Sequence, residues 1–206
     1  EEAYRKLQGT IPVISLSFAN VKEDTYEKTK IRICQILTDL YIRYSFVQNS
    51  DVLTARDREY FDRVSERMAD TDAVIALYKL SDFVQRYYGK KPIILLDEYD
   101  TPMLEAYVNG YWDEMVSFTR GLFNSTFKTN PSLERALLTG ITQISKESIF
   151  SDLNNIEVIT TTSEKYSTSF GFTEAEVAGA LEQFGLKEHL HQVRHWYDGF
   201  CFGSQT

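Results

Sequence analysis

Residues 92–100 read Pro-Ile-Ile-Leu-Leu-Asp-Glu-Tyr-Asp, and this stretch decides the fold. Four apolar residues lead directly into adjacent carboxylates. That pattern is typical of a buried parallel strand that brings acids to the carboxyl edge of an α/β sheet, where such sheets bind their ligands. Asp97 and Glu98 are therefore the first candidates for a functional site.

In P-loop nucleotidases, the strand that carries the magnesium-binding Asp has this form, and a Glu that activates water often follows it. The partner motif G-x-x-x-x-G-K-[ST] is not in these residues, because Gly89 alone precedes a Lys and has no glycine five positions before it. The chain therefore contains one half of such a site.

Side chains of successive strand residues point to opposite faces, so Asp97 and Glu98 have different tasks. Magnesium takes carboxylate oxygens together with several waters, so one or two acids can suffice. The alternative is that these acids cap the next helix or face solvent. A phosphatase motif Asp-x-Asp is excluded by the spacing of Asp97 and Asp100, and a nuclease motif Glu-x-Lys does not occur.

The composition is that of an ordinary globular protein: 206 residues, 43% hydrophobic and 25% charged. A net charge of −8 argues against broad binding to a phosphate backbone, so we expect nucleic-acid contacts only through other domains. No stretch is long enough to span a membrane, and no secretory signal opens the sequence. Two cysteines without metal or redox spacing fit a reducing compartment, so we expect a cytoplasmic protein.

Strands and helices alternate along most of the chain, which predicts a mainly parallel sheet with helices on both faces. The expected strands are 11–18, 93–97, 135–140 and 157–162. Helix starts are expected at Asp24-Thr25, Thr54, Asp72 and Thr101-Pro102, and helix ends include Gly89. From Thr173, which forms a capping box with Glu176, the pattern is wholly helical. We therefore expect an α/β core over residues 1–170 and the start of a helical subdomain over 171–206.

The strand at 135–140 ends on hydroxyl and amide side chains. Thr139, Thr142 and Gln143 are each suited to sense a γ-phosphate or orient an attacking water, and Lys146 offers positive charge to a phosphate. The alternative is a hydroxyl-rich turn that caps a helix near Ser148.

Three stretches together resemble one family: residues 93–102 (IILLDEYDTP), 138–155 (LTGITQISKESIFSDLNN), and 170–177 (FGFTEAEV) with 196–203 (WYDGFCFG). The sequence is similar to the AAA-ATPase-like proteins of bacteria, in which a divergent P-loop ATPase domain commonly precedes a restriction-endonuclease-like domain. The resemblance covers most of the chain.

The resemblance implies a three-layer P-loop NTPase fold that binds ATP and Mg²⁺. It implies that Asp97 coordinates magnesium and Glu98 polarises water, with Thr139 and Gln143 as sensors. Asp100 and Lys146 are the expected contacts to the nucleotide. Many relatives carry Arg at the place of Gln143, so hydrolysis is expected to be weak even in a complete protein.

The family's Walker A motif lies before the strand at 11–18, so we expect this chain to be a fragment and to hydrolyse ATP poorly by itself. A homo-oligomer is also expected, because such sites often use an arginine of a neighbouring copy, for which Arg120 and Arg135 are candidates. The rival hypothesis is a non-catalytic interaction or regulatory domain that retains the fold, within a larger nucleic-acid-processing protein.

Overall fold

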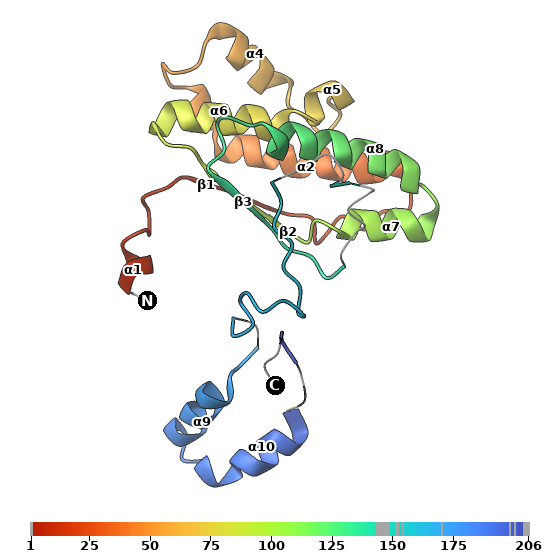
Figure 1. The fold of residues 1–206 in the computed structure, drawn as a ribbon. Coiled ribbons are helices and arrows are strands. Elements are labelled where there is room, and N and C mark those ends of the chain that lie inside the picture. The colour runs from red at the N-terminus through yellow and green to blue at the C-terminus, as the bar shows by residue number, and fades with distance from the viewer. Residues whose placement is uncertain are drawn as a thin grey trace. The chain divides into compact units, whose positions relative to one another are not determined.

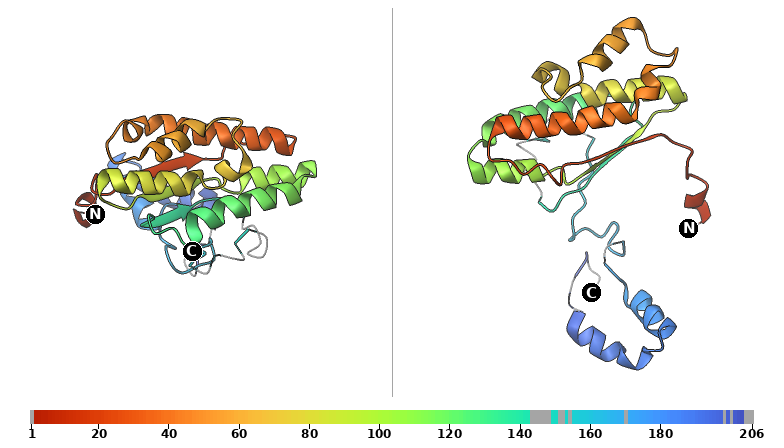
Figure 2. Two further views of the ribbon diagram at one scale, coloured as in Figure 1. Left: turned by 90° about the horizontal axis from the view of Figure 1, so that it is seen from above. Right: turned by 180° about the vertical axis from the view of Figure 1, so that it is seen from behind.

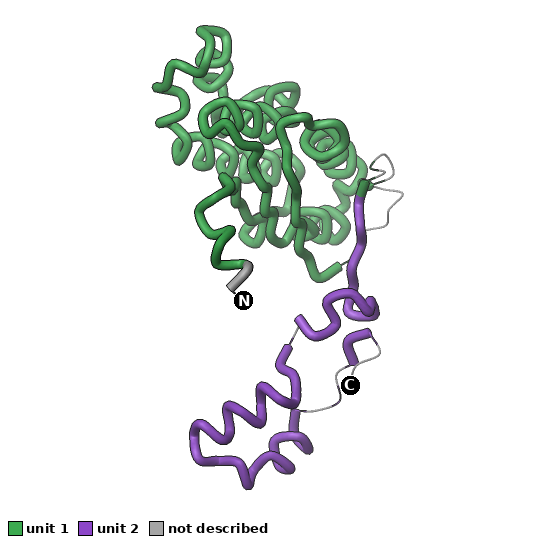
Figure 3. Tube along the Cα trace, turned by 60° about the vertical axis from the view of Figure 1, so that its left-hand side comes forward, with its two compact units in different colours: residues 1–155 green, residues 156–206 purple. Residues whose placement is uncertain are grey.

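The computed structural model describes residues 2–142, 149–150, 153, 155–169, 171–197, 199 and 201–203. It divides into unit 1, residues 1–155, and unit 2, residues 156–206 (Figure 3). Unit 1 contains, in order, α1 (Glu2–Arg5), β1 (Val13–Ser17), α2 (Tyr26–Arg43), α3 (Ser45–Gln48), α4 (Ala55–Arg63), α5 (Asp70–Ala73), α6 (Ala76–Tyr88), β2 (Ile93–Asp97), α7 (Thr101–Asn109), α8 (Trp112–Phe123), the short π-helix η1 (Asn124–Lys128) and β3 (Arg135–Leu138). Unit 2 contains α9 (Glu174–Gln183), the 3₁₀ turn η2 (Lys187–His189) and α10 (Leu190–Tyr197).

β2, the strand that ends at Asp97, is the central strand of a parallel sheet in the order β1-β2-β3. In the register, Ser17 lies opposite Asp97 on one side, and Leu96 lies opposite Leu138 on the other. The predicted α/β class with a parallel sheet is confirmed, and three of the expected strands form.

The helices that connect the strands, among them α2, α6 and α8, cover one face of this sheet (Figures 1 and 2). Both connections move in the same direction along the sheet, and right-handed crossovers then place their helices on the same side. The opposite face carries Val13 and Leu137, which are 43% and 58% exposed. These connections therefore do not supply the second helical layer that we predicted.

The core lies between the sheet and its helices. Ile14 and Ile94 are completely buried on the helical face. From α2, the Tyr41 ring packs 4.6 Å from that of Phe61, and its hydroxyl donates to the carbonyl of Ala76 at 2.8 Å. The buried hydroxyl of Tyr41 is thus paired, as buried polar groups in folded proteins usually are.

The free edge of β1 is closed by side chains from the end of α2. Arg43 Nη2 donates to the carbonyl of Ser15 at 3.2 Å, and the Tyr44 hydroxyl donates to the carbonyl of Val13 at 2.7 Å. These donors occupy acceptors that another strand would need, so this edge resists further pairing.

Local start and stop signals are confirmed where they act within a few residues. The confirmed caps are Thr25, Thr54 and Thr173 at helix N-termini, Pro102 in a first turn, and Gly89 with φ +65° at a C-terminus. In unit 2, none of the residues of α9 and α10 is buried. No helix in the described ranges is both long and apolar enough to cross a bilayer.

Two predicted features are wrong. Residues 157–162 form no strand, because no segment that the structure describes forms a ladder with them. The Thr160 hydroxyl makes local contacts with Thr162 and Ser163 instead. Asp72 does not cap the following helix. It lies within α5 and accepts two hydrogen bonds from the Arg63 guanidinium, each 3.1 Å long.

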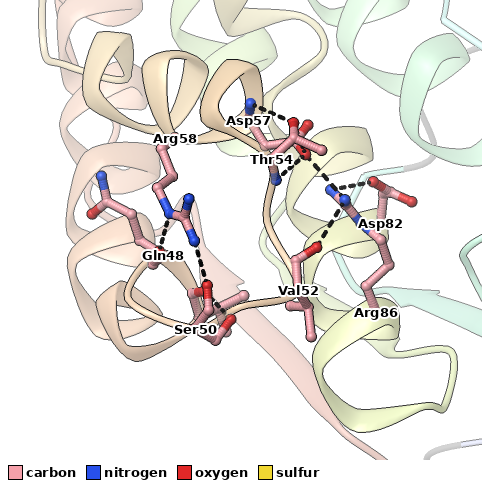
Figure 4. A network of polar contacts seen from close by, with 9 residues as sticks. Gln48, Ser50, Val52, Thr54, Asp57, Arg58, Asp82 and Arg86 are labelled. Atoms are coloured by element: carbon pink, nitrogen blue, oxygen red, sulfur yellow. Dashed lines mark hydrogen bonds and ion pairs between the residues drawn. The ribbon is translucent and has the colours of Figure 1, made fainter.

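A polar network fastens α4 to α6 (Figure 4). Arg86 Nη1 donates to Asp57 Oδ2 at 3.0 Å and to the carbonyl of Val52 at 3.1 Å, and Arg86 Nη2 pairs with Asp82 Oδ2 at 3.0 Å. Asp57 also completes the capping box with Thr54. Burial opposes ionisation, but the bonds from Thr54 and Arg86 lower the pKa of Asp57 to about 2.

We expect Asp57→Asn to lower the free energy of unfolding by about 1–2 kcal/mol near neutral pH, the usual range for a lost cap. Because the folded pKa lies below the ordinary value of 3.8, this contribution is present above about pH 4 and is lost as the pH falls towards 2. The difference in the free energy of unfolding between the wild type and the variant, measured with urea, should therefore be smaller at pH 3 than at pH 6. Asp62→Asn, on the same helix, is the control, and a constant gap at both pH values would contradict the assignment.

Candidate functional site

Three oxygen-bearing side chains lie in a row across the carboxyl edge of the sheet. Ser17 ends β1, Asp97 ends β2, and Thr139 follows β3. Leu96 is buried under the helices, so alternation directs Asp97 to the open face, where all three residues are exposed. The site therefore opens on the side of the sheet that the connecting helices leave uncovered.

Asp97 is the centre of this row. Thr139 Oγ1 donates to Asp97 Oδ1 at 2.5 Å, and Ser17 Oγ lies 3.5 Å from Asp97 Oδ2. These are the hard oxygen ligands that magnesium prefers, and the exposure leaves space for the waters that this ion retains. No three His, Cys, Asp or Glu side chains of the described residues cluster as a metal site. The row thus fits an ion held by one carboxylate and water.

Glu98 occupies an unusual backbone conformation directly after Asp97. Its φ is +50°, in the left-handed region that non-glycine residues rarely adopt. Its Oε2 accepts a hydrogen bond from Thr101 Oγ1 at 3.0 Å, in the first turn of α7. Such strain persists only where surrounding contacts enforce it, and it is concentrated at functional sites.

Asp100 has a different environment from the other two acids. It is completely buried, and its Oδ2 accepts from the backbone N–H of Thr142 at 2.6 Å. Among the described residues, its Oδ1 has no hydrogen-bond partner. The structure therefore brings Asp97, Glu98 and Thr139 to the sheet edge together, but it places the Asp100 carboxylate inside the protein. Gln143 and Lys146, the remaining predicted site residues, lie outside the described residues.

A shallow pocket of about 480 Å³ lies beside the row, along β1 and α2. It is lined by Ser15, Leu16, Ser17, Ile36, Asp39, Arg43 and Asp97. Arg43 gives this pocket a positive charge, and the two carboxylates give it negative charge. The pocket is thus a mixed-charge surface that reaches the central carboxylate.

The loop between β1 and α2 is fastened to Tyr111, the residue that precedes α8. The Tyr111 hydroxyl donates to the carbonyl of Glu23 at 2.7 Å and lies 2.9 Å from Thr29 Oγ1. Burial raises the pKa of Tyr111, so the phenol stays protonated and keeps donating to the loop. This anchor joins the loop after β1 and the first turn of α2 to the start of α8.

The sequence matches the AAA-ATPase-like family model, described as "Predicted AAA-ATPase", over residues 1–150. The chain belongs to the AAA-ATPase-like family. The match includes β1, β2 and β3, so the whole row of this AAA-ATPase-like domain lies within it. The family resemblance seen in the sequence is confirmed.

One curated relative is the "Uncharacterized protein in vnfD 5'region" of Azotobacter chroococcum mcd 1. It is 33% identical to this AAA-ATPase-like chain over 121 residues, which are 57% of the chain and 23% of the relative. The matched part thus spans less than a quarter of that relative's length. No solved structure matches the chain.

Ser17 is the residue of this row that sequence reasoning missed. The signal was present, because Ser15 and Ser17 alternate with buried Leu16 and Phe18 and so share the face that Asp97 uses. Only the register of β1 with β2 shows that Ser17 is the direct neighbour of Asp97.

Proposed function

We propose that this domain contributes the magnesium-binding and water-activating half of an ATPase site. The observation that supports this most directly is the row of Ser17, Asp97 and Thr139 beside a strained Glu98, in a chain of the AAA-ATPase-like family. Asp97 is the proposed metal ligand, and the Ser17 and Thr139 hydroxyls orient its two oxygens. Bound magnesium would neutralise charge on the β- and γ-phosphates.

Glu98 is the proposed base. It takes a proton from the water whose oxygen bonds to the γ-phosphorus, while the bond from that phosphorus to the oxygen shared with the β-phosphate breaks. ADP and phosphate are the products. Thr139 is the proposed sensor of the γ-phosphate, Gln143 is proposed to orient the water, and Lys146 to bind phosphate. Assembly into a homo-oligomer is part of the same proposal.

The test is magnesium-dependent ATP hydrolysis by the intact protein, which is the protein as the cell makes it. We expect Asp97→Ala to lower the affinity for ATP in the presence of Mg²⁺ by at least about tenfold, since even indirect contacts to a metal are worth 10–100-fold. Titration calorimetry with and without Mg²⁺ measures this change.

Asp39→Ala is the matched control, because Asp39 lines the same pocket from α2 and receives no hydrogen bond from Thr139. We expect it to leave the magnesium dependence unchanged. An intact protein that shows no magnesium-dependent ATP binding or hydrolysis would contradict the proposed function and favour a non-catalytic domain.

A further inference from the structure

Tyr99 and Asp100 join the end of β2 to the turn at residues 139–142. The Tyr99 N–H donates to the carbonyl of Thr139 at 3.0 Å, and its hydroxyl donates to the carbonyl of Thr142 at 3.2 Å. The Thr142 N–H donates to Asp100 Oδ2 at 2.6 Å. Three hydrogen bonds thus hold a four-residue turn along its whole length.

Gly140 makes this attachment close as well as polar. A Cβ atom at this position would lie 2.5 Å from Asp100 Oδ1 and 2.9 Å from the Tyr99 ring. Gly140 is not among the glycines with positive φ, so space rather than backbone conformation requires it. The Asp100 carboxylate therefore packs directly against the turn.

Asp100 is itself held by a rigid element. Its carbonyl accepts from the N–H groups of Met103 and Leu104 at 3.0 Å each, at the start of α7. Met103 is completely buried, so this first turn is anchored in the core. The end of β2, the start of α7 and the turn after β3 are thereby connected through one residue, Asp100.

We propose that Asp100 is a positioning residue, which holds the 139–142 turn so that the Thr139 hydroxyl stays on Asp97. Tyr99 shares this task through its two bonds to the turn. The inference rests on the proposed ATPase function, and it replaces the nucleotide contact expected for Asp100. A carboxylate that is completely buried acts on the site through the turn and does not touch a ligand at the exposed row.

A double-mutant cycle in the intact protein tests this role. We expect Asp100→Ala to lower kcat for ATP hydrolysis by about 10–100-fold, the range found for residues that orient a ligand of a metal, with little change in KM. The Asp100→Ala/Thr139→Ala double variant should be no slower than Thr139→Ala, because both changes remove the same hydroxyl from Asp97. Asp100→Asn should restore most of the rate, since its amide oxygen also accepts from Thr142.

Additive losses in the cycle, or a loss that lies mainly in KM, would overturn the proposal. A direct contact of Asp100 with the nucleotide predicts the loss in KM. A general loss of folding lowers the apparent kcat without changing KM, because less of the protein is active. It differs from the proposal in that the double variant would be slower than Thr139→Ala and amide exchange would also speed up far from the turn.

Amide hydrogen exchange of Thr142 tests the attachment without using activity. We expect the Thr142 N–H to exchange about tenfold faster in Asp100→Ala than in the wild type, because a hydrogen bond to a charged group is lost. Asp100→Asn should stay near the wild type, and the amide of Met68 is the control. Unchanged exchange at Thr142 would overturn the attachment. If the wild type does not hydrolyse ATP, the proposed function fails, and this measurement decides the positioning role by itself.

Discussion

Glu98→Gln should lower the ATP turnover of the intact protein by about 10²–10⁴-fold, the usual contribution of a general base. Gln has the length of Glu, and its side-chain oxygen can still accept the hydrogen bond from Thr101 Oγ1, which is 3.0 Å long in the wild type. It cannot take a proton from water. Glu and Gln adopt the left-handed backbone conformation of this position, φ +50°, with similar difficulty, so the fold should be preserved.

Steady-state hydrolysis and ATP binding, measured separately, check this expectation. We expect kcat to fall while ATP affinity in the presence of Mg²⁺ stays within about threefold, since the base acts in the transition state and contributes little to ground-state binding. Glu105→Gln is the matched control. It makes the same change from Glu to Gln, but within α7, seven residues after Glu98 in the sequence. Unchanged turnover in Glu98→Gln would show that another group activates the water.

Gly140→Ala should destabilise the protein by about 1–3 kcal/mol, the cost of inserting a methyl group into a closely packed position. The added carbon would lie 2.5 Å from Asp100 Oδ1 and 2.8 Å from its Cγ. Asp100 is fixed at the start of α7, so the turn must move instead, and Thr139 moves with it. We therefore also expect a loss of hydrolysis comparable to that of Thr139→Ala.

Gly179→Ala is the control for replacing a glycine by alanine. Gly179 lies within α9, and a Cβ atom there meets nothing within 4 Å. This change should be neutral or stabilise its helix by about 0.5–1 kcal/mol. Urea unfolding of both variants measures the difference. A Gly140→Ala protein with wild-type stability and activity would show that the turn can move freely without consequence.

Several features of the fold follow from short-range physics and were predictable from the residues. The run 93–97 is a strand, and acids follow it at the sheet edge. The capping boxes at Thr54 and Thr173 depend on a residue three positions later, so the sequence contains both partners. The strand prediction failed where a strand needs a pairing partner from a distant part of the sequence. The segment 157–162 has strand propensity, yet a strand needs a neighbour that propensity does not supply.

The sequence by itself determined that Asp97 ends a buried strand, that Glu98 follows it, and that a hydroxyl, Thr139, follows the next strand. It also determined the family, because these motifs occur in order within one chain. Only the tertiary structure decided that Ser17 is the neighbour of Asp97 and that Asp100 is buried against Gly140. The physical reason is that local propensity acts over a few residues, whereas strand register and burial depend on contacts between segments about 40 to 80 residues apart in the chain.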